Sequence, residues 1–234
     1  SAIGLVDKDL DFTFLNLNDC KVYDRVDELK KIYKKFDIFT CQFSGAVFHP
    51  VCYEYPERKY KEISESKVYG KFGSVKNLLK KFEPNFYIPA AGPPVFLDPN
   101  LVSINYEEVN IFSSPYKFKD YLNKELPDLK VEVPIPGSAF ELNSGDIDVF
   151  HQVADVEAEY DKENIKNYAE QYEYVFKERE NQKVKYEPLE IQKKLFDELK
   201  MKLSKFKIEQ KMNVTMEFSL DEISETSIYV DFDN

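Results

Sequence analysis

Apolar and polar residues alternate along the first part of the chain in a pattern typical of α/β proteins. Two apolar runs, residues 3–6 and 11–17, surround a short polar turn and predict a β-hairpin. Helices and strands then alternate: an amphipathic helix after Asp24, a buried strand, a second helix and a third strand, the last three at 37–43, 72–82 and 85–89. Short connections in this order predict parallel strands with right-handed crossovers.

The carboxyl ends of these three strands carry small or polar residues. Asn18-Asp19, Ser44-Gly45 and Ala91-Gly92 follow the first, second and third parallel strand. Ligands of open α/β sheets bind beyond the carboxyl ends of the strands, so these residues predict one substrate site at one sheet edge. A carboxylate at Asp19 can act on a ligand there. The alternative is that Asn18 and Asp19 only cap the following helix.

Residues 49–65 are irregular and rich in tyrosine and proline, which predicts a long ordered loop over this sheet edge. Long loops in compact domains often carry function. His49 lies in this loop near the expected cleft, and we take it as a candidate substrate-binding residue. The alternative is an ordinary surface histidine.

The composition changes near residues 150–155, which predicts two regions, 1–150 and 151–234. Two long charged helices follow at 161–183 and 188–206, with apolar faces that we expect to be core. Two alternating segments near the C-terminus, 212–218 and 226–232, predict a terminal hairpin. The second region is therefore expected to be an α+β extension of the first.

Charge and cysteine content narrow the classes of function and location. A formal net charge of −11 over 234 residues argues against nucleic acid as the main partner, because phosphate contacts need clustered lysine and arginine. The three cysteines form no CxxC pair, which fits reduced thiols in the cytoplasm. There is no signal peptide, and no apolar run approaches the roughly 20 residues that a membrane-spanning helix needs. We therefore expect a cytoplasmic protein without a membrane or nucleic-acid partner.

Three stretches together resemble a known family: LNLNDC at 15–20, FSGAVFHPVCYEYP at 43–56 and YIPAAGPPVFLDP at 87–99. They are similar to the metallo-β-lactamase-fold region of CMP-N-acetylneuraminate hydroxylase-like proteins and their bacterial relatives, which often carry a Rieske iron–sulfur domain as well. The resemblance covers about residues 3–140. It implies the second half of an αββα sandwich, followed by a helical and β-hairpin extension.

The resemblance also implies a function, a metal-dependent hydrolase or oxidoreductase acting on a small substrate, nucleotide-linked or not. Asp19 looks like the family's strand-end acidic residue, which binds the divalent zinc or iron ion of metal-containing members. The family's HxHxDH-type motif would precede residue 1, and the chain opens without methionine. We therefore expect a fragment that is incomplete as a catalyst, with no catalytic residue assigned. Its missing N-terminal half would come from the same or a second protein chain.

The sequence departs from the family pattern at two points. A histidine that follows the third strand in many members is replaced here by Ala90-Ala91-Gly92, which puts a complete dinuclear site in doubt. The paired Cys-x-His segments of a Rieske domain are absent, which predicts no iron–sulfur cluster in this chain. The competing hypothesis is a non-catalytic binding or scaffold module that uses the tyrosine-rich loop and the charged helices for a protein partner.

Overall fold

The computed structural model describes residues 2–45, 47–92, 94–143, 146–182, 188–203, 215–220 and 223–231. The chain forms two compact units, Ser1–Phe176 and Lys177–Asn234. The composition change near residues 150–155 falls inside the first unit. The functional division into 1–150 and 151–234 stays a prediction.

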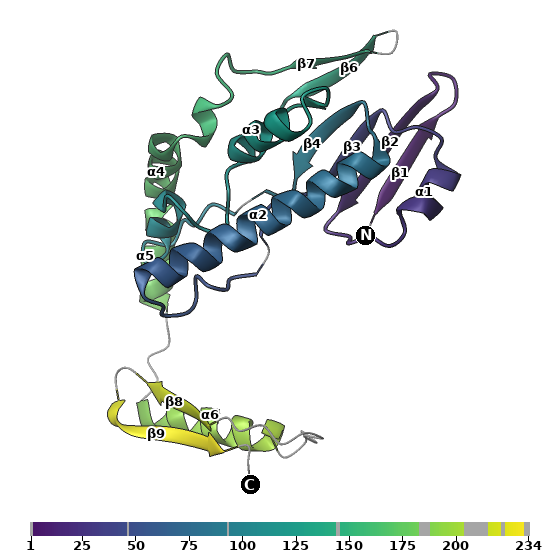
Figure 1. Cartoon of the computed structure of the whole chain (residues 1–234). Coiled ribbons are helices and arrows are strands. Elements are labelled where there is room, and N and C mark those ends of the chain that lie inside the picture. The colour runs from purple at the N-terminus through teal and green to yellow at the C-terminus, as the bar shows by residue number, and fades with distance from the viewer. Residues whose placement is uncertain are drawn as a thin grey trace. The chain divides into compact units, whose positions relative to one another are not determined.

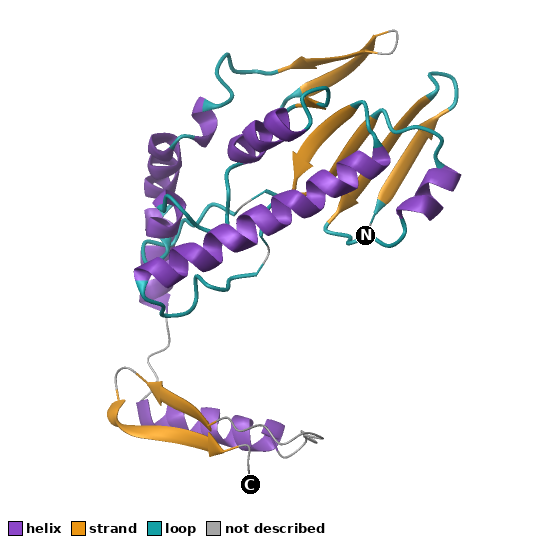
Figure 2. Cartoon of the chain, viewed as in Figure 1, coloured by secondary structure: helices purple, strands orange, loops and turns teal. Residues whose placement is uncertain are grey.

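A five-stranded sheet forms the centre of the first unit (Figures 1 and 2). In spatial order its strands are β1 (Ile3–Asp7), β2 (Phe12–Asn18), β3 (Ile38–Gln42), β4 (Phe86–Ala90) and β5 (Lys130–Val131). β1 is antiparallel to β2, and β2 to β5 are parallel to one another. The predicted hairpin, the parallel strands and the mixed α/β class are confirmed.

The connections between the parallel strands contain three α-helices that pack on one face of the sheet (Figure 1). They are α1 (Val26–Ile32), α2 (Glu57–Phe82) and α3 (Pro115–Glu125). In β2 buried residues alternate with less buried ones, as period-two alternation requires, whereas residues 38–41 of the central strand β3 are all buried. The largest buried side chains are aromatic and come from both layers: Phe39, Phe43, Phe72, Phe82, Tyr87 and Phe118.

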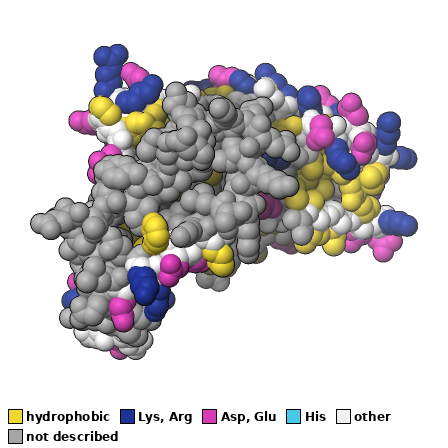
Figure 3. Space-filling view, turned by 90° about the horizontal axis from the view of Figure 1, so that it is seen from below, with side chains coloured by type: hydrophobic (Ala, Val, Ile, Leu, Met, Phe, Trp, Pro, Cys, Tyr) yellow, Lys and Arg dark blue, Asp and Glu magenta, His cyan; other side chains and the backbone are white. Residues whose placement is uncertain are grey.

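The opposite face of the sheet is less covered at its β1 edge. Leu5 pairs in register with Phe14, which is only half-buried, whereas the neighbouring Leu15 is 2% exposed. Ile3 and Leu5 are more than half exposed. Figure 3 shows hydrophobic side chains gathered on the side of the molecule that carries β1 and α1. A second sheet packed against this one, as the αββα sandwich requires, stays a prediction.

Helix α2 is longer than the sequence pattern indicated. It begins at Glu57 after Pro56, so the expected loop over 49–65 is wrong for its last nine residues, 57–65. Proline is common before the first helical turn, and Tyr60, Ser64 and Val68 continue the buried side of the helix at intervals of four residues. Tyr60, Tyr69 and Gly70 concealed the helical period in the part of α2 that precedes Phe72.

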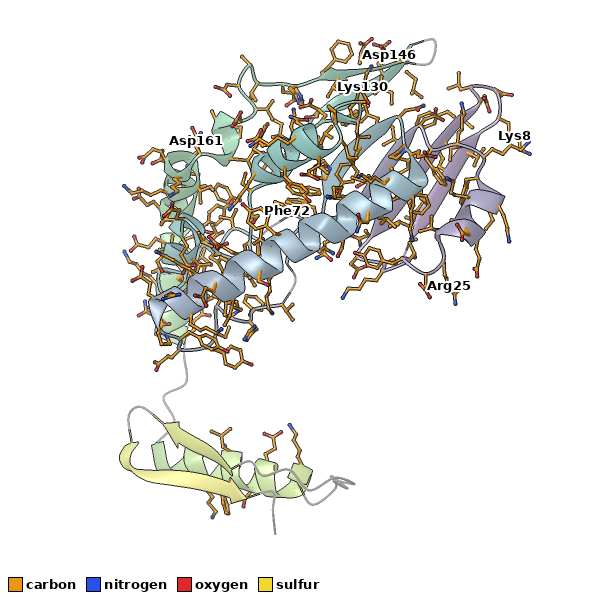
Figure 4. The ribbon with its side chains drawn as sticks, viewed as in Figure 1. Lys8, Arg25, Phe72, Lys130, Asp146 and Asp161 are labelled. Carbon is orange, nitrogen blue, oxygen red and sulfur yellow. The ribbon has the colours of Figure 1, made fainter. Side chains whose placement is uncertain are left out.

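Further elements complete the two units. In the first, β6 (Ala139–Asn143) and β7 (Asp146–Phe150) form a hairpin that was not predicted, and the ion pair between Lys130 and Asp146, 2.6 Å apart, ties it to β5 (Figure 4). The remaining elements are the short 3-10 helices η1 (Val102–Tyr106) and η2 (Ala158–Tyr160), the helices α4 (Lys162–Gln171), α5 (Glu173–Gln182) and α6 (Pro188–Leu203), and the strands β8 (Thr215–Leu220) and β9 (Ile223–Asp231).

The C-terminal predictions are confirmed in type and corrected in extent. The helix expected over 161–183 divides at Tyr172 into α4 and α5, and the terminal hairpin forms from β8 and β9. The predicted starts and ends that fall at 204–214 lie outside the described residues. Among the helices that the structure describes, none combines the length and the apolar character needed to cross a membrane.

Asp37 joins the amino ends of three strands. Its carboxylate accepts hydrogen bonds from the Thr13 amide at 2.8 Å and from the Asn85 side chain at 3.1 Å. Asp37→Ala leaves the part-buried Thr13 amide without this acceptor, so we expect a loss of about 1–3 kcal/mol in the free energy of unfolding. Urea denaturation followed by circular dichroism measures it. The exposed helical substitution Asp120→Ala is the control, and an equal effect of the two would contradict the expected role of Asp37.

Candidate functional site

Helix α2 extends well beyond the carboxyl edge of the sheet. Its 26 residues span about 39 Å at 1.5 Å per residue, whereas a five-residue strand spans about 17 Å. The chain leaves β3 at the carboxyl edge and returns to β4 through α2, so the N-terminal half of α2 lies past the strand ends (Figure 1). This half of the helix therefore forms one wall at the edge where ligands of such sheets bind.

Three aromatic rings hold the loops at this edge together. Phe48 follows β3, Phe96 follows β4, and Phe112 precedes α3; their ring centroids lie 5.2 to 6.2 Å apart in edge-to-face contacts. The Gly45 amide also donates to the Ile111 carbonyl at 3.4 Å. A Cβ at position 45 would lie 3.0 Å from that carbonyl oxygen, so glycine permits the close approach of the two loops.

A cavity of about 340 Å³ lies between these loops and α2. Phe43, Val68, Phe72 and Ile111 form its apolar side. Figure 4 labels Phe72 on α2, whose ring lies 4.5 Å from that of Phe118 on α3 and is fixed there by packing. The polar side carries three lysines and three serines: Lys21, Lys67, Lys71, Ser44, Ser74 and Ser113.

The lysines of the cavity have no carboxylate beside them. No Asp or Glu is among the residues that line it, and within the described residues Lys21, Lys67 and Lys71 form no ion pair within 4.0 Å. Burial lowers the pKa of Lys71, and the positive charge of Lys21 lowers this pKa further, although Cys41 acts in the opposite direction. The cavity therefore holds uncompensated positive charge.

Two hydroxyl groups at the cavity are buried without a partner. Ser44 is 2% exposed and Ser113 is 6% exposed, and the Oγ of each has no hydrogen bond within the described residues. Most buried polar side-chain atoms in proteins have a partner, so two orphaned hydroxyls at one cavity need an explanation. The turn that carries Ser113 is well defined, because the buried Asn110 side chain accepts from the Phe112 amide at 2.7 Å and donates to the Ile104 carbonyl at 2.7 Å.

The structure brings some of the predicted site residues to this cavity and leaves others away from it. Ser44 and Gly45 line it, whereas Asn18, Asp19, His49, Ala91 and Gly92 do not. Asn18 is exposed in a left-handed conformation, with its amide bonded to the Asn16 side chain at 2.7 Å. Substrate binding by these residues, and metal binding by Asp19, stay predictions. Among the residues that the structure describes, no three His, Cys, Asp or Glu side chains are grouped to hold a metal ion.

His49 takes part in a local aromatic cluster. Its Nε2 lies 2.9 Å from the Tyr55 hydroxyl, and its ring contacts that of Tyr53 edge to face at 5.1 Å. These contacts order the loop that leads into α2.

Sequence reasoning missed the lysines and Tyr23, which also lines the cavity. Lys67 and Lys71 are four residues apart, which places them on one side of a helix, and this spacing was a usable signal. It was overlooked because the helix was expected to begin only at Phe72.

The three cysteines differ in accessibility. Cys41 is buried against Tyr87, whose hydroxyl lies 3.8 Å from its Sγ, and burial raises the pKa of the Cys41 thiol to about 11, whereas Cys52 is exposed. We therefore expect iodoacetamide at pH 8 to modify Cys52 at least about 100-fold faster than Cys41, since the thiolate is the reactive form. Peptide mass spectrometry measures the rates, and labelling in urea shows that every thiol can react. Comparable rates in the folded chain would contradict the packing of Cys41.

Comparisons with known proteins identify relatives of this chain by sequence. The chain is 29% identical over 159 residues to a protein of Mycolicibacterium smegmatis, covering 66% of this chain and 30% of the relative. It is 29% identical over 138 residues to a protein of Mycobacterium tuberculosis, covering 58% of this chain and 26% of the relative. Both carry the provisional name Rieske 2Fe-2S iron-sulfur protein. No family model matches the chain. No solved structure matches it either.

These relatives overturn three expectations. The assignment to the metallo-β-lactamase-fold family is wrong, because the relatives are named for a Rieske cluster. The expected metal-dependent hydrolase or oxidoreductase is contradicted for the same reason, and nothing favours the alternative of a scaffold module. The expected cofactors, a zinc or iron ion and no iron–sulfur cluster, conflict with a name that specifies 2Fe-2S. The matched segments span less than a third of the relatives' own length.

A Rieske cluster needs two cysteines on one iron and two histidines on the other, and the described residues do not fit it. Both histidines have other partners: His49 bonds to Tyr55, and His151 Nδ1 lies 2.8 Å from the Ser138 hydroxyl. Cys41 is buried in the core cluster, whereas Cys52 is exposed, and no three His, Cys, Asp or Glu side chains of the described residues are grouped to hold a metal ion. The described residues form a cavity lined by lysines and serines, and they do not group as the ligands of a Rieske cluster.

Proposed function

We propose that this chain is the ligand-binding part of a Rieske-type iron–sulfur protein that transfers electrons. The likeness to proteins named for a Rieske 2Fe-2S cluster carries the proposal. The cavity at the carboxyl edge of the sheet supports ligand binding as the contribution of these residues. Because the described residues do not fit the cluster, the proposal assigns the cluster ligands to other residues of the whole protein.

The role proposed for the cavity is to hold the molecule that gains or loses electrons. Its loops are fixed by aromatic contacts and by the Gly45–Ile111 hydrogen bond, so the site is formed before a ligand arrives. A preformed site loses less conformational entropy on binding than a mobile one. The sheet and α2 thus act as a rigid support for the ligand.

The full-length natural protein, purified without oxygen, tests the proposal. After reduction with dithionite we expect the electron paramagnetic resonance signal of a [2Fe–2S] cluster, with iron and acid-labile sulfide in equal amounts. The signal should persist in the Cys41→Ser and His49→Gln variants, since neither residue is assigned to the cluster. A full-length protein that shows no such signal after reconstitution with iron and sulfide would overturn the proposal. Loss of the signal in both variants would overturn the placement of the ligands.

A further inference from the structure

We infer that the cavity binds a small organic anion, whose carboxylate or phosphate group lies among Lys21, Lys67 and Lys71 and accepts hydrogen bonds from Ser44 and Ser113. The inference rests on the proposed function in taking this cavity as the ligand site. It adds the chemical class of the ligand, which no relative's name specifies.

The charge distribution is the first argument. The chain carries 43 acidic and 32 basic residues, so a cavity with three lysines and no carboxylate in its wall is unusual in it. Several lysines elsewhere sit beside acids, as in the pairs Lys76–Glu125 at 2.7 Å and Lys119–Glu132 at 3.2 Å. The cavity lysines lack such a partner among the described residues, and an anionic ligand supplies one.

The placement of two lysines on α2 is the second argument. Lys67 and Lys71 stand four residues apart on one side of the helix, where like charges repel and weaken the helix. Lys71 is half-buried, so water compensates its charge less than it would at the surface. An anion between the two ammonium groups converts this repulsion into attraction.

The orphaned hydroxyls are the third and independent argument. Ser44 and Ser113 come from two different loops, both residues line the cavity, and the Oγ of each is buried without a partner within the described residues. A hydroxyl is a donor as well as an acceptor, and oxyanions are the acceptors that bind such donors most strongly. The serines therefore complete a set of donors around one negatively charged group.

The apolar wall indicates that the ligand is organic. Val68, Phe72 and Ile111 also line the cavity, and a volume of about 340 Å³ exceeds the space that one inorganic anion fills. We therefore expect a molecule with an anionic group at one end and an apolar or aromatic body at the other.

Isothermal titration calorimetry on the 234-residue chain tests the inference with three probes of similar shape. Phenyl phosphate and benzoate carry the two anionic groups, and benzamide is the uncharged analogue. We expect at least one anion to bind at least about tenfold more tightly than benzamide, and the stronger of the two identifies the preferred group. Inorganic phosphate should compete with the bound probe.

Substitutions locate the binding. Lys71→Met and Lys67→Met keep an apolar side chain and should each weaken the anion at least about tenfold, whereas Lys124→Met, at an exposed lysine of α3, should not change it. Ser44→Ala should weaken the anion without lowering the melting temperature, because its hydroxyl has no partner to lose. Equal binding of benzamide and both anions, no binding of either anion, or equal effects of Lys71→Met and Lys124→Met would overturn the inference. The electron paramagnetic resonance measurement on the full-length protein tests the proposed function separately. Its result does not decide whether the cavity binds an anion.

Discussion

Phe39→Ala should lower the free energy of unfolding of the first unit by about 3–5 kcal/mol, the range for removing a fully buried phenylalanine. Phe39 is 0% exposed at the middle of β3, the central strand of the sheet. Its ring lies 4.9 Å from Phe82 on α2 and 6.2 Å from Tyr87 on β4, so it contacts both layers. Alanine at this position leaves a cavity that a packed sheet and helix cannot close.

Urea denaturation monitored by near-ultraviolet circular dichroism measures this loss. Phe150→Ala is the matched control, because Phe150 on β7 is 54% exposed and its removal should cost less than about 1 kcal/mol. A loss at Phe39 no larger than the loss at Phe150 would mean that α2 does not pack on the sheet as described.

The sequence contained enough information for most of the sheet. The pattern of apolar and polar residues predicted β1 and β2. In β2, Leu15 and Leu17 are buried and the Asn18 that follows them is exposed. Short connections then predicted the parallel order. The hairpin of β6 and β7 was not predicted, although its segments, AFELN and DIDVF, alternate in polarity, because each run has only five residues.

The family and the site were harder to predict for a physical reason. The stretches that suggested a metallo-β-lactamase-like protein are strand exits, and any parallel sheet with ligand-binding loops uses small and polar residues there. The lysines that line the cavity come from α2 and from the loop after β2. In the sequence alone they look like ordinary surface lysines, because the start of α2 at Glu57 was not predicted. The resemblance implied a cation at Asp19, whereas the structure gathers three lysines around the cavity that Ser44 and Gly45 line.

Lys71→Glu should have the second largest effect, a loss of affinity for the anion that does not come from a loss of the fold. A carboxylate at position 71 can pair with Lys67 or Lys21, both of which line the same cavity. It also repels the anion that the wild-type site is inferred to hold. We therefore expect at least about a 100-fold loss of affinity, close to 3 kcal/mol, for whichever of phenyl phosphate and benzoate binds more tightly, since like charges brought together in a site cost several kcal/mol.

The neutral substitution Lys71→Met should not lower the melting temperature of the free chain. The pKa of Lys71 is lowered in the folded state, so the charged side chain destabilises the fold at every pH below that lowered pKa. This loss of stability disappears as the pH rises from the lowered pKa to 10.5, the ordinary value of a lysine. Removing the positive charge relieves this penalty at neutral pH. A cavity lysine that served only to stabilise the fold would give the opposite result.

The pH dependence of binding supplies the last discriminating observation. For the wild-type chain the affinity for the anion should fall as the pH rises past the lowered pKa of Lys71, because the ammonium that contacts the ligand is then neutral. In Lys71→Met this alkaline fall should move toward the ordinary pKa of an exposed lysine, and in the control Lys124→Met it should stay as in the wild type. Calorimetric titrations between pH 7 and pH 11 measure all three profiles. A wild-type affinity that stays constant across this range would show that Lys71 does not contact the anion.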